Sequence, residues 1–260
     1  MKDLHLAIGI FDGVHVGHRM IIGKAVKHAQ HDWSGVLTFH PHPKRVLNLP
    51  NAPQMIYPIR QRYRLIQELG VSRIFIKRFT DAWSQFCPDR FFEFLRRIFP
   101  NLNTIYVGED FRFGYRRQGD IHTLEALCSR DTHVKLDVTP NCTHDGERIC
   151  STRIRTLLHE GQVPLMNLLL GKSYHRWATL KQSPVKNLYD VRFTCTYEAS
   201  LPLGTYEVQL RGQHDLSLAQ CIVQPSGCQI ALTRPPSKLP CAVIIDFMRR
   251  LDKEMPFVKS

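Results

Sequence analysis

Residues 9–18 read GIFDGVHVGH and decide how the first part of this chain folds. The segment follows the apolar run Leu4–Ile10 and precedes the amphipathic run Met20–Ala29. This order predicts a β-strand, a tight glycine turn and then an α-helix. Gly13 and Gly17 can adopt a positive φ or let a ligand approach the backbone closely.

Two histidines, His15 and His18, stand three residues apart where the predicted helix begins. Free backbone N–H groups and the helix dipole attract anions at such a position. Imidazoles donate hydrogen bonds to phosphate oxygens, so the pair suits a triphosphate and can stabilise charge that grows at its α-phosphate. A metal site and ordinary surface histidines are the alternatives. The metal site is the weaker of the two, because no Glu, Asp or third His completes a ligand set here.

The composition is that of a globular protein with a basic balance. The chain has 260 residues, of which 43% are hydrophobic and 22% charged, which allows one large or two small domains. Its formal net charge of +12 attracts polyanions, a class that includes both nucleotides and nucleic acids. The sequence lacks a clustered Lys/Arg tract, so we expect no nucleic-acid partner. A basic nucleic-acid-binding protein is the non-enzymatic alternative.

Cysteine spacing and hydropathy indicate the compartment. None of the eight cysteines forms a C-x-x-C pair, so neither a zinc ribbon nor a redox motif is indicated. The first ten residues lack a signal-peptide layout, and no run approaches the roughly 20 apolar residues of a membrane span. We therefore expect a cytoplasmic protein with free thiols and no membrane partner.

Strand and helix patterns alternate through the first part of the chain. Strands are predicted at Leu4–Ile10, Gly35–Phe39, Arg73–Phe79, Thr104–Val107 and Val134–Val138. Helices are predicted at His18–Ala29, Pro58–Leu69, Pro88–Phe99 and Ile121–Cys128. This alternation predicts an α/β fold with a parallel sheet, whose ligands bind beyond the carboxyl ends of the strands.

The pattern changes after about Gly171, where short β-like runs are separated by prolines. Such runs predict a small β-rich second domain, which we expect to end in a helix near Asp246–Lys253. The predicted strands are Tyr189–Tyr197, Thr205–Leu210, Ala219–Val223, Gln229–Leu232 and Ala242–Ile245.

A second motif, VGEDFRFG, occupies residues 107–114 and is followed by further arginines. Arginines that alternate with aromatic residues suit a flat anionic ligand, because rings stack and guanidinium groups bind phosphate. A hairpin-like loop with core aromatics and solvated arginines explains the pattern equally well.

A third motif, ICSTRIR, occupies residues 149–155. Ser151 or Thr152 can cap the following helix, and their hydroxyls can form a phosphate clamp together with an arginine. A simple capped amphipathic helix is the alternative.

A fourth motif, LTFHPHP, occupies residues 37–43. Pro41 and Pro43 lock the backbone as it leaves a strand, which fits either a rigid wall beside a bound ring or a structural turn.

In this order and spacing, the four motifs resemble the N-terminal adenylyltransferase domain of bacterial FAD synthetases, which are usually bifunctional riboflavin kinase/FMN adenylyltransferases. The resemblance covers about residues 5–174 and ends in LGKSY, which is similar to the family's LGRPY. It implies a Rossmann-like nucleotidylyltransferase domain over residues 1–174 and a barrel-like, riboflavin-kinase-like domain over residues 175–260. It also implies transfer of AMP from ATP to FMN, giving FAD and pyrophosphate, with Mg²⁺ accompanying ATP.

The resemblance also implies roles for individual residues. It makes His15, His18 and Arg155 the expected catalytic residues. It assigns ATP binding to Gly9, Ile10, Phe11, Asp12, His15, Gly17, His18, Ser151, Thr152 and Arg155. It assigns FMN binding to Phe39, Pro41, Pro43, Asp110, Phe111 and Phe113. No protein ligand for a metal is expected, because phosphates and water would hold most of the Mg²⁺ coordination.

The sequence departs from the family at several places. Cys150 stands where a serine is common, and Asp110 where asparagine is frequent. PLGTYEV and VIIDFMRR, at residues 202–208 and 243–250, resemble segments of the kinase domain, but its G-F-P-T-A-N motif is absent. We therefore expect a degenerate barrel without riboflavin phosphorylation. A bifunctional enzyme and a nucleotidylyltransferase with another phosphorylated acceptor are the alternatives.

Overall fold

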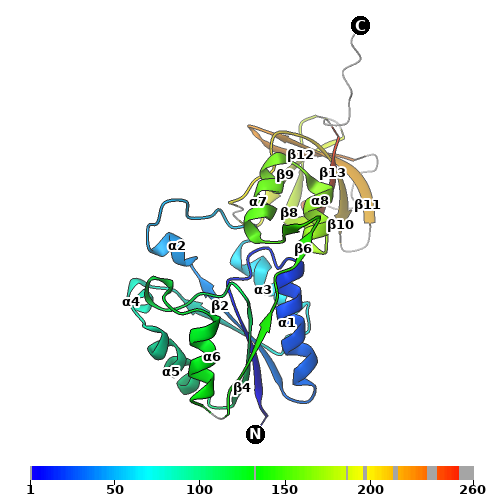
Figure 1. Ribbon diagram of the computed structural model, residues 1–260. Coiled ribbons are helices and arrows are strands. Elements are labelled where there is room, and N and C mark those ends of the chain that lie inside the picture. The colour runs from blue at the N-terminus through cyan, green and yellow to red at the C-terminus, as the bar shows by residue number, and fades with distance from the viewer. Residues whose placement is uncertain are drawn as a thin grey trace. The chain divides into compact units, whose positions relative to one another are not determined.

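The computed structural model describes residues 2–131, 133–185, 187–195, 198–212, 216–232 and 239–251. The chain divides into two compact units, residues 1–150 and residues 151–260 (Figure 1). Each unit is built around its own sheet, an open one in the first and a closed barrel in the second.

The first unit is built on five parallel strands in the order β3-β2-β1-β4-β5. The strands are β1 (Leu4–Ile8), β2 (Trp33–His40), β3 (Arg73–Arg78), β4 (Leu102–Gly108) and β5 (Lys135–Thr139). All five predicted strands are confirmed. Since β1 lies between β2 and β4, the chain reverses its direction of travel across the sheet there, and such a switch point is where open α/β sheets bind ligands.

Helices join these strands, and the four predicted helices are confirmed with small shifts in their ends. The helices are α1 (Val16–Ala29), α2 (Pro43–Val46), α3 (Ile59–Gln67), α4 (Asp81–Ser84), α5 (Pro88–Ile98) and α6 (Ile121–Ser129), with a short 3₁₀ turn η1 (Tyr115–Arg117). A small hairpin, β6 (Thr143–His144) and β7 (Glu147–Arg148), ends the unit. Figure 1 shows α1 on one side of the sheet, with α5 and α6 on the other.

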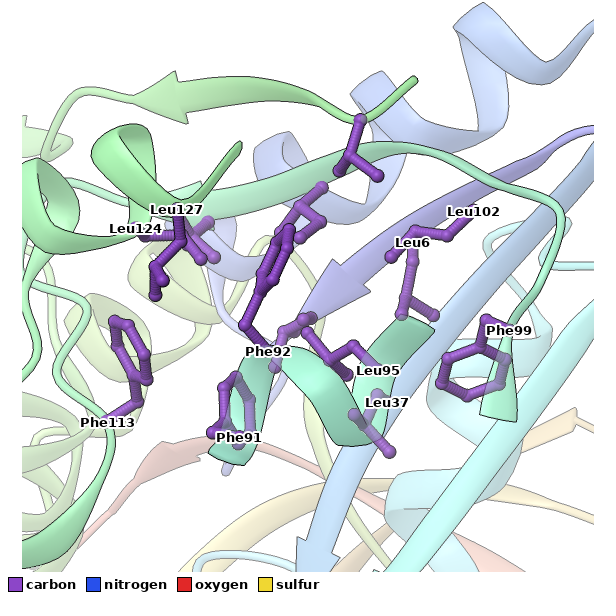
Figure 2. Close-up of a cluster of buried hydrophobic side chains, with 14 of the residues drawn as sticks. Leu6, Leu37, Phe91, Phe92, Leu95, Phe99, Leu102, Phe113, Leu124 and Leu127 are labelled. Carbon is purple, nitrogen blue, oxygen red and sulfur yellow. The ribbon is translucent and has the colours of Figure 1, made fainter. Parts of the chain in front are cut away.

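A hydrophobic core of the first unit lies between the sheet and the helices α5 and α6. Leu6 of β1 and Leu37 of β2 pack there with Phe91 and Leu95 of α5 and Leu124 of α6 (Figure 2). Successive strand residues point to opposite faces, so the intervening Ala7, also fully buried, faces the α1 side. Burial on both faces explains why β1 and β2 are nearly continuous apolar runs.

The second unit begins with two helices, α7 (Ser151–Glu160) and α8 (Val163–Leu170). Six antiparallel strands then close into a barrel in the order β10-β11-β12-β9-β8-β13. They are β8 (Tyr174–Gln182), β9 (Leu188–Phe193), β10 (Gly204–Arg211), β11 (Leu216–Gln224), β12 (Gly227–Ala231) and β13 (Cys241–Arg250). The fold class, an α/β domain followed by a β-barrel, is thereby confirmed. The predicted strand Tyr189–Tyr197 corresponds to β9, which ends at Phe193, and Tyr197 lies outside the described residues.

The helix expected near Asp246–Lys253 is wrong. Asp246–Arg250 continues strand β13, which pairs with β8 on one side and β10 on the other. Val243, Ile245 and Phe247 are buried at every second position, which is the period of a strand. A short apolar run does not by itself distinguish a strand from a helix, and the two ladders decide the outcome here. Asp252 and Lys253 lie outside the described residues.

Hydrogen bonds join helix α8 of the second unit to the barrel. The Asn167 side chain of α8 donates to the Phe247 carbonyl (2.8 Å) and accepts from the Tyr174 N–H (2.7 Å), which joins α8 to β13 and β8. By compactness the chain therefore divides after residue 150, and a functional division after residue 174 stays a prediction. Over the described ranges, the model contains no helix with the length and apolar character needed to span a membrane.

Candidate nucleotide site at the carboxyl edge of the sheet

The turn between β1 and α1 is wound tightly. Phe11 (φ 53°), Gly13 (φ 84°) and Val14 (φ 46°) all have left-handed backbones, and the Val14 N–H donates to the Phe11 carbonyl over 3.2 Å. A positive φ is costly for bulky and β-branched residues, and such strain concentrates at functional sites. Gly9 makes room for the turn, because a Cβ there would lie 2.9 Å from Cζ of the buried Phe11 ring.

The two histidines of the first motif lie face to face at the start of α1. His15 is the N-cap residue and is only 5% exposed, and its Nδ1 accepts a hydrogen bond from the His18 N–H over 3.4 Å. The two rings stack with centroids 3.5 Å apart and planes 21° from parallel. The Phe11 and His18 rings pack edge to face, with centroids 5.3 Å apart and planes 89° from parallel.

The cap hydrogen bond assigns a tautomer to His15. Since Nδ1 accepts a hydrogen bond, neutral His15 carries its proton on Nε2. The Nε2–H is then a donor held in place by the N-cap geometry, beside the first N–H groups of α1, which have no acceptor within the helix. This arrangement of donors suits an anion.

Asp12, predicted to shape the nucleotide pocket, lies beneath the turn. Its carboxylate is 2% exposed and accepts backbone N–H bonds from Ile56 (3.1 and 3.2 Å) and Tyr57 (3.5 Å). The contacts tie the segment before α3 to the first motif. Asp12 therefore acts on the site through the backbone that it anchors.

Arg62 of α3 joins the ends of two strands and was not predicted from the sequence. Its side chain is 1% exposed and donates to the Ile10 carbonyl after β1 (2.8 Å) and the Phe39 carbonyl in β2 (3.2 Å). Burial lowers the pKa of Arg62, and the negative charge of Asp12 acts in the opposite direction. An arginine on an amphipathic helix normally predicts a solvated face, so the sequence carried no signal for this role.

The end of β2 carries the proline motif. Phe39 is buried in the core, with its ring centroid 6.3 Å from those of Phe79 and Trp83. The His40–Pro41 peptide is cis, and Pro43 is the first residue of α2. Both prolines are half-buried. The motif thus combines a core aromatic residue with a rigid turn at the edge of the sheet.

The loop after β4 contains the aromatic motif. Phe113 is buried in the core 5.1 Å from Phe91, measured between ring centroids, and it forms an isolated bridge to Gly119. For Phe113, the structure therefore agrees with the alternative interpretation of this motif, a hairpin-like loop with core aromatics. Phe111 is half-buried and stacks on Phe113 at 5.5 Å, and the exposed Asp110 forms an ion pair with Arg148 of β7.

The candidate residues of the first unit share one edge of the sheet. The turn after β1 is bonded to β2 through Gly9 N–H to the Leu37 carbonyl (3.1 Å) and the Thr38 hydroxyl to the Ile10 carbonyl (3.0 Å). Strand β4 flanks β1 on the other side and ends at Gly108, so its loop begins at the same edge. This edge includes the switch point of the sheet.

The third motif begins helix α7 in the second unit. Ser151 is the first residue of α7, so the Ser151 and Thr152 hydroxyls lie in the first turn and Arg155 lies one turn further along. Ile154, Leu157 and Leu158 form the buried face of the helix, while Arg155 is half-buried. The first turn of a helix presents free N–H groups, so this segment can also bind an anion.

A metal site of protein ligands is not apparent. Among the residues that the model describes, no group of three or more His, Cys, Asp or Glu side chains could hold a metal ion. Two carboxylates of these motifs are engaged otherwise, Asp12 with backbone N–H groups and Asp110 with Arg148.

Comparison with known proteins gives one family and one fold. A family model described as FAD synthetase matches residues 1–153. The bifunctional riboflavin kinase/FMN adenylyltransferase of Bacillus subtilis is 32% identical over 172 residues, which are 65% of this chain and 54% of that protein. The FAD synthetase of Listeria monocytogenes is 27% identical over 205 residues, 78% of this chain and 79% of that protein. The chain spans about half the length of several of the curated relatives that it matches.

A solved structure agrees over nearly the whole chain. It is titled as a macrolide-efflux protein from Streptococcus pneumoniae, has a TM-score of 0.83 and 20% sequence identity, and covers 96% of this chain and 94% of that one. At this identity the likeness concerns the fold alone. The family model covers more than half of the chain and includes the turn, the stacked histidines and the loops at the switch point, and the chain therefore belongs to the FAD synthetase family.

Proposed function

We propose that this chain transfers the AMP group of ATP to the phosphate of FMN, producing FAD and pyrophosphate. The stacked His15–His18 pair at the N-terminus of α1 is the observation that carries the proposal. The pair lies at the carboxyl edge of the parallel sheet, next to the switch point where such sheets bind nucleotides. Family membership supports the same chemistry.

The reaction needs no nucleophile from the protein. A phosphate oxygen of FMN attacks the α-phosphorus of ATP, a new P–O bond forms, and the bond to the β-phosphate oxygen breaks, so that pyrophosphate leaves with its electrons. The attacking oxygen is already anionic. Catalysis then depends on aligning two anions and on offsetting the charge that grows at the α-phosphate and the leaving group.

Different residues are proposed to bind different parts of ATP. In the proposal, the His15 Nε2–H and the His18 ring donate to phosphate oxygens, and Gly9, Ile10, Phe11 and Gly17 shape the nucleotide side. Asp12 acts beneath that turn. Ser151, Thr152 and Arg155 bind phosphate from the start of α7, where a guanidinium can form two parallel bonds.

The flavin side is assigned to the two loops that flank the first motif. Phe111, Pro41 and Pro43 are half-buried at the edge and can meet a ring, and the exposed Asp110 precedes Phe111 in the loop after β4. Phe39 and Phe113 are core residues, so in this proposal they support that surface from below. The proposed substrate therefore lies beyond the ends of β2 and β4.

Mg²⁺ would enter with ATP and offset phosphate charge. The side chains described offer it no ligand cluster, so phosphate oxygens and water would provide its coordination and no residue is assigned to it.

We further infer that the barrel does not phosphorylate riboflavin. The G-F-P-T-A-N segment of family kinases is absent from the sequence. We place the protein in the cytoplasm, where ATP is available and thiols stay reduced.

Product analysis by chromatography tests these proposals. The protein is incubated with ATP and Mg²⁺ together with either FMN or riboflavin. We expect FAD from FMN and no product from riboflavin. FMN or FAD formed from riboflavin would contradict the inference about the barrel. No FAD from FMN would overturn the main proposal, and a screen of other phosphorylated acceptors, with a salt titration against labelled RNA and DNA, would then separate the alternatives.

A further inference from the structure

Two sulfur atoms meet beside the first turns of α1, near the carboxyl edge of the sheet. The thiol of Cys142, in the segment after β5, donates to the sulfur of Met20 on α1 over 2.9 Å. A Cβ placed on Gly17 would lie 3.8 Å from the same thiol and 3.4 Å from the His15 ring. This pair of residues, the sulfur patch, therefore adjoins the helix start where the proposed phosphate donors lie.

The sulfur patch is open to a ligand. Met20 is 44% exposed and Cys142 is half-buried. Gly17 lies three residues before Met20, on the same face of the helix, and has no side chain to cover the patch. Covering an apolar thioether is favourable, so a flat apolar ring can bind at this place.

The side of α1 that carries Met20 faces β5. Lys24, one turn after Met20, forms an ion pair with Asp137 of β5 over 2.7 Å. Strand residues two apart point to the same side, so Thr139 at the end of β5 also faces α1. Its hydroxyl is buried and has no hydrogen-bond partner among the residues that the structure describes. Such a group is rare in proteins, and a polar atom of a ligand can satisfy it.

The side of the turn toward α3 is filled by the protein itself. Asp12 binds the segment that precedes α3, and Val14 of the turn is fully buried. Arg19 of α1 donates to the Val14 carbonyl over 3.1 Å. A nucleotide whose phosphates meet His15 and His18 therefore has room for its base on the side toward β5.

We propose that the sulfur patch is the surface on which the base of ATP lies. The inference rests on the proposed adenylyl transfer, which places the phosphates at His15 and His18. In a nucleoside triphosphate one ribose separates the base from the α-phosphate, and Met20 lies about one helical turn beyond Gly17. The faces of a purine are flat and apolar, and polarizable sulfur packs favourably against aromatic rings. The Thr139 hydroxyl, on the same side, gains a polar partner from the nucleoside.

Protection of Cys142 from alkylation tests where the base lies. Trypsin cuts after Lys135 and Arg148, and the peptide 136–148 contains Cys142 as its single cysteine. The full-length protein is treated with iodoacetamide for increasing times, digested and analysed by mass, without ligand or with ATP, adenosine or tripolyphosphate. At about ten times their Kd, ATP and adenosine should slow alkylation of Cys142 about tenfold, because only the unbound protein reacts. Tripolyphosphate, which lacks a base, should leave the rate unchanged.

Cys87 provides the control for this measurement. It is also half-buried, and it is the N-cap residue of α5, which lies on the other side of the sheet from α1 (Figure 1). The peptide 79–90 contains Cys87 as its single cysteine, and its alkylation should not respond to any of the three ligands.

The outcomes separate this inference from the proposed function. If the protein forms FAD from FMN but Cys142 reacts equally fast with and without ATP, the placement of the base is overturned and the proposed function stands. Protection by tripolyphosphate equal to that by adenosine would overturn the placement too. A protein that forms no FAD and shows no protection by ATP would contradict both.

Variants of Met20 provide a second test. Met20→Ala should raise the KM for ATP roughly two- to tenfold, the value of a contact between sulfur and an aromatic ring. The kcat should change little, because the base is held equally in the ground state and the transition state. Met20→Leu keeps the volume and should recover most of the loss. Ile98→Ala on α5, where Ile98 is 49% exposed, is the matched control and should leave the KM unchanged. An unchanged KM in Met20→Ala would overturn the proposal.

Discussion

Replacing Arg62 by methionine should weaken both the fold and the proposed activity of the first unit. Methionine keeps most of the volume of the side chain but removes the donors to the Ile10 and Phe39 carbonyls. Each hydrogen bond from a charged donor contributes about 1.5–3 kcal/mol. Part of this lost free energy is recovered, because the variant no longer has to bury the charged guanidinium, which burial disfavours.

The net loss in the free energy of unfolding should be about 2–4 kcal/mol. In a chain of this size, each kcal/mol lowers the melting temperature by about 2–4 °C, so a fall of roughly 5–15 °C is expected. Turnover should fall as well, because the Ile10 and Phe39 carbonyls belong to the two segments that form the edge of the site. Thermal denaturation and FAD formation from FMN measure the two effects.

Arg60 provides the matched control, because it lies on the same helix and is exposed. Arg60→Met should leave the melting temperature within about 2 °C, as is usual for surface substitutions. If Arg62→Met had the same melting temperature and the same turnover as Arg60→Met, the bridging role given to Arg62 would be refuted.

The remaining predictions concern the site and the barrel. His18→Ala should reduce turnover by roughly tenfold to a thousandfold if the ring stabilises transition-state charge, whereas the exposed His122→Ala on α6 should not; equal rates would remove His18 from the catalytic residues. Arg155→Lys should raise the apparent KM for ATP, because a guanidinium that can donate two parallel hydrogen bonds is replaced by a single ammonium charge. An unchanged KM would indicate that the start of α7 has only a structural role. Gly9→Ala should destabilise the protein by about 1–3 kcal/mol and slow FAD formation, because the new methyl displaces the Phe11 ring that packs on His18; a wild-type melting curve would argue against this contact. Burial lowers the pKa of His175, so below about pH 6.5 the unfolded chain binds more protons than the folded chain. The free energy of unfolding should therefore be highest above that pH and fall as the pH drops toward the folded pKa, less steeply in His175→Gln. Wild-type denaturation curves that coincide at pH 5 and pH 7 would contradict this prediction.

Local patterns were sufficient for most of the architecture. The alternation of apolar runs with amphipathic segments predicted all five strands of the sheet, and the glycine turn at residues 9–18 placed the histidines at a helix start. These features depend on interactions between residues close in sequence, such as strand and helix periodicity and turn geometry. The same patterns predicted a strand at Ala242–Ile245 but a helix after it, because the pairing that continues β13 to Arg250 is made with the distant strands β8 and β10.

The sequence by itself therefore determined the order of the strands of the parallel sheet and of the main helices between them, the division into an α/β part and a β part, and the residues that gather at a helix start. Only the tertiary structure decided which polar groups are buried and what they hold. Asp12 and Arg62 gained their roles from partners more than 20 residues away, as did Arg176 of β8, whose guanidinium donates to the Ala199 carbonyl. Burial of a polar group is permitted only where a partner satisfies it, and that partner is brought near by the fold.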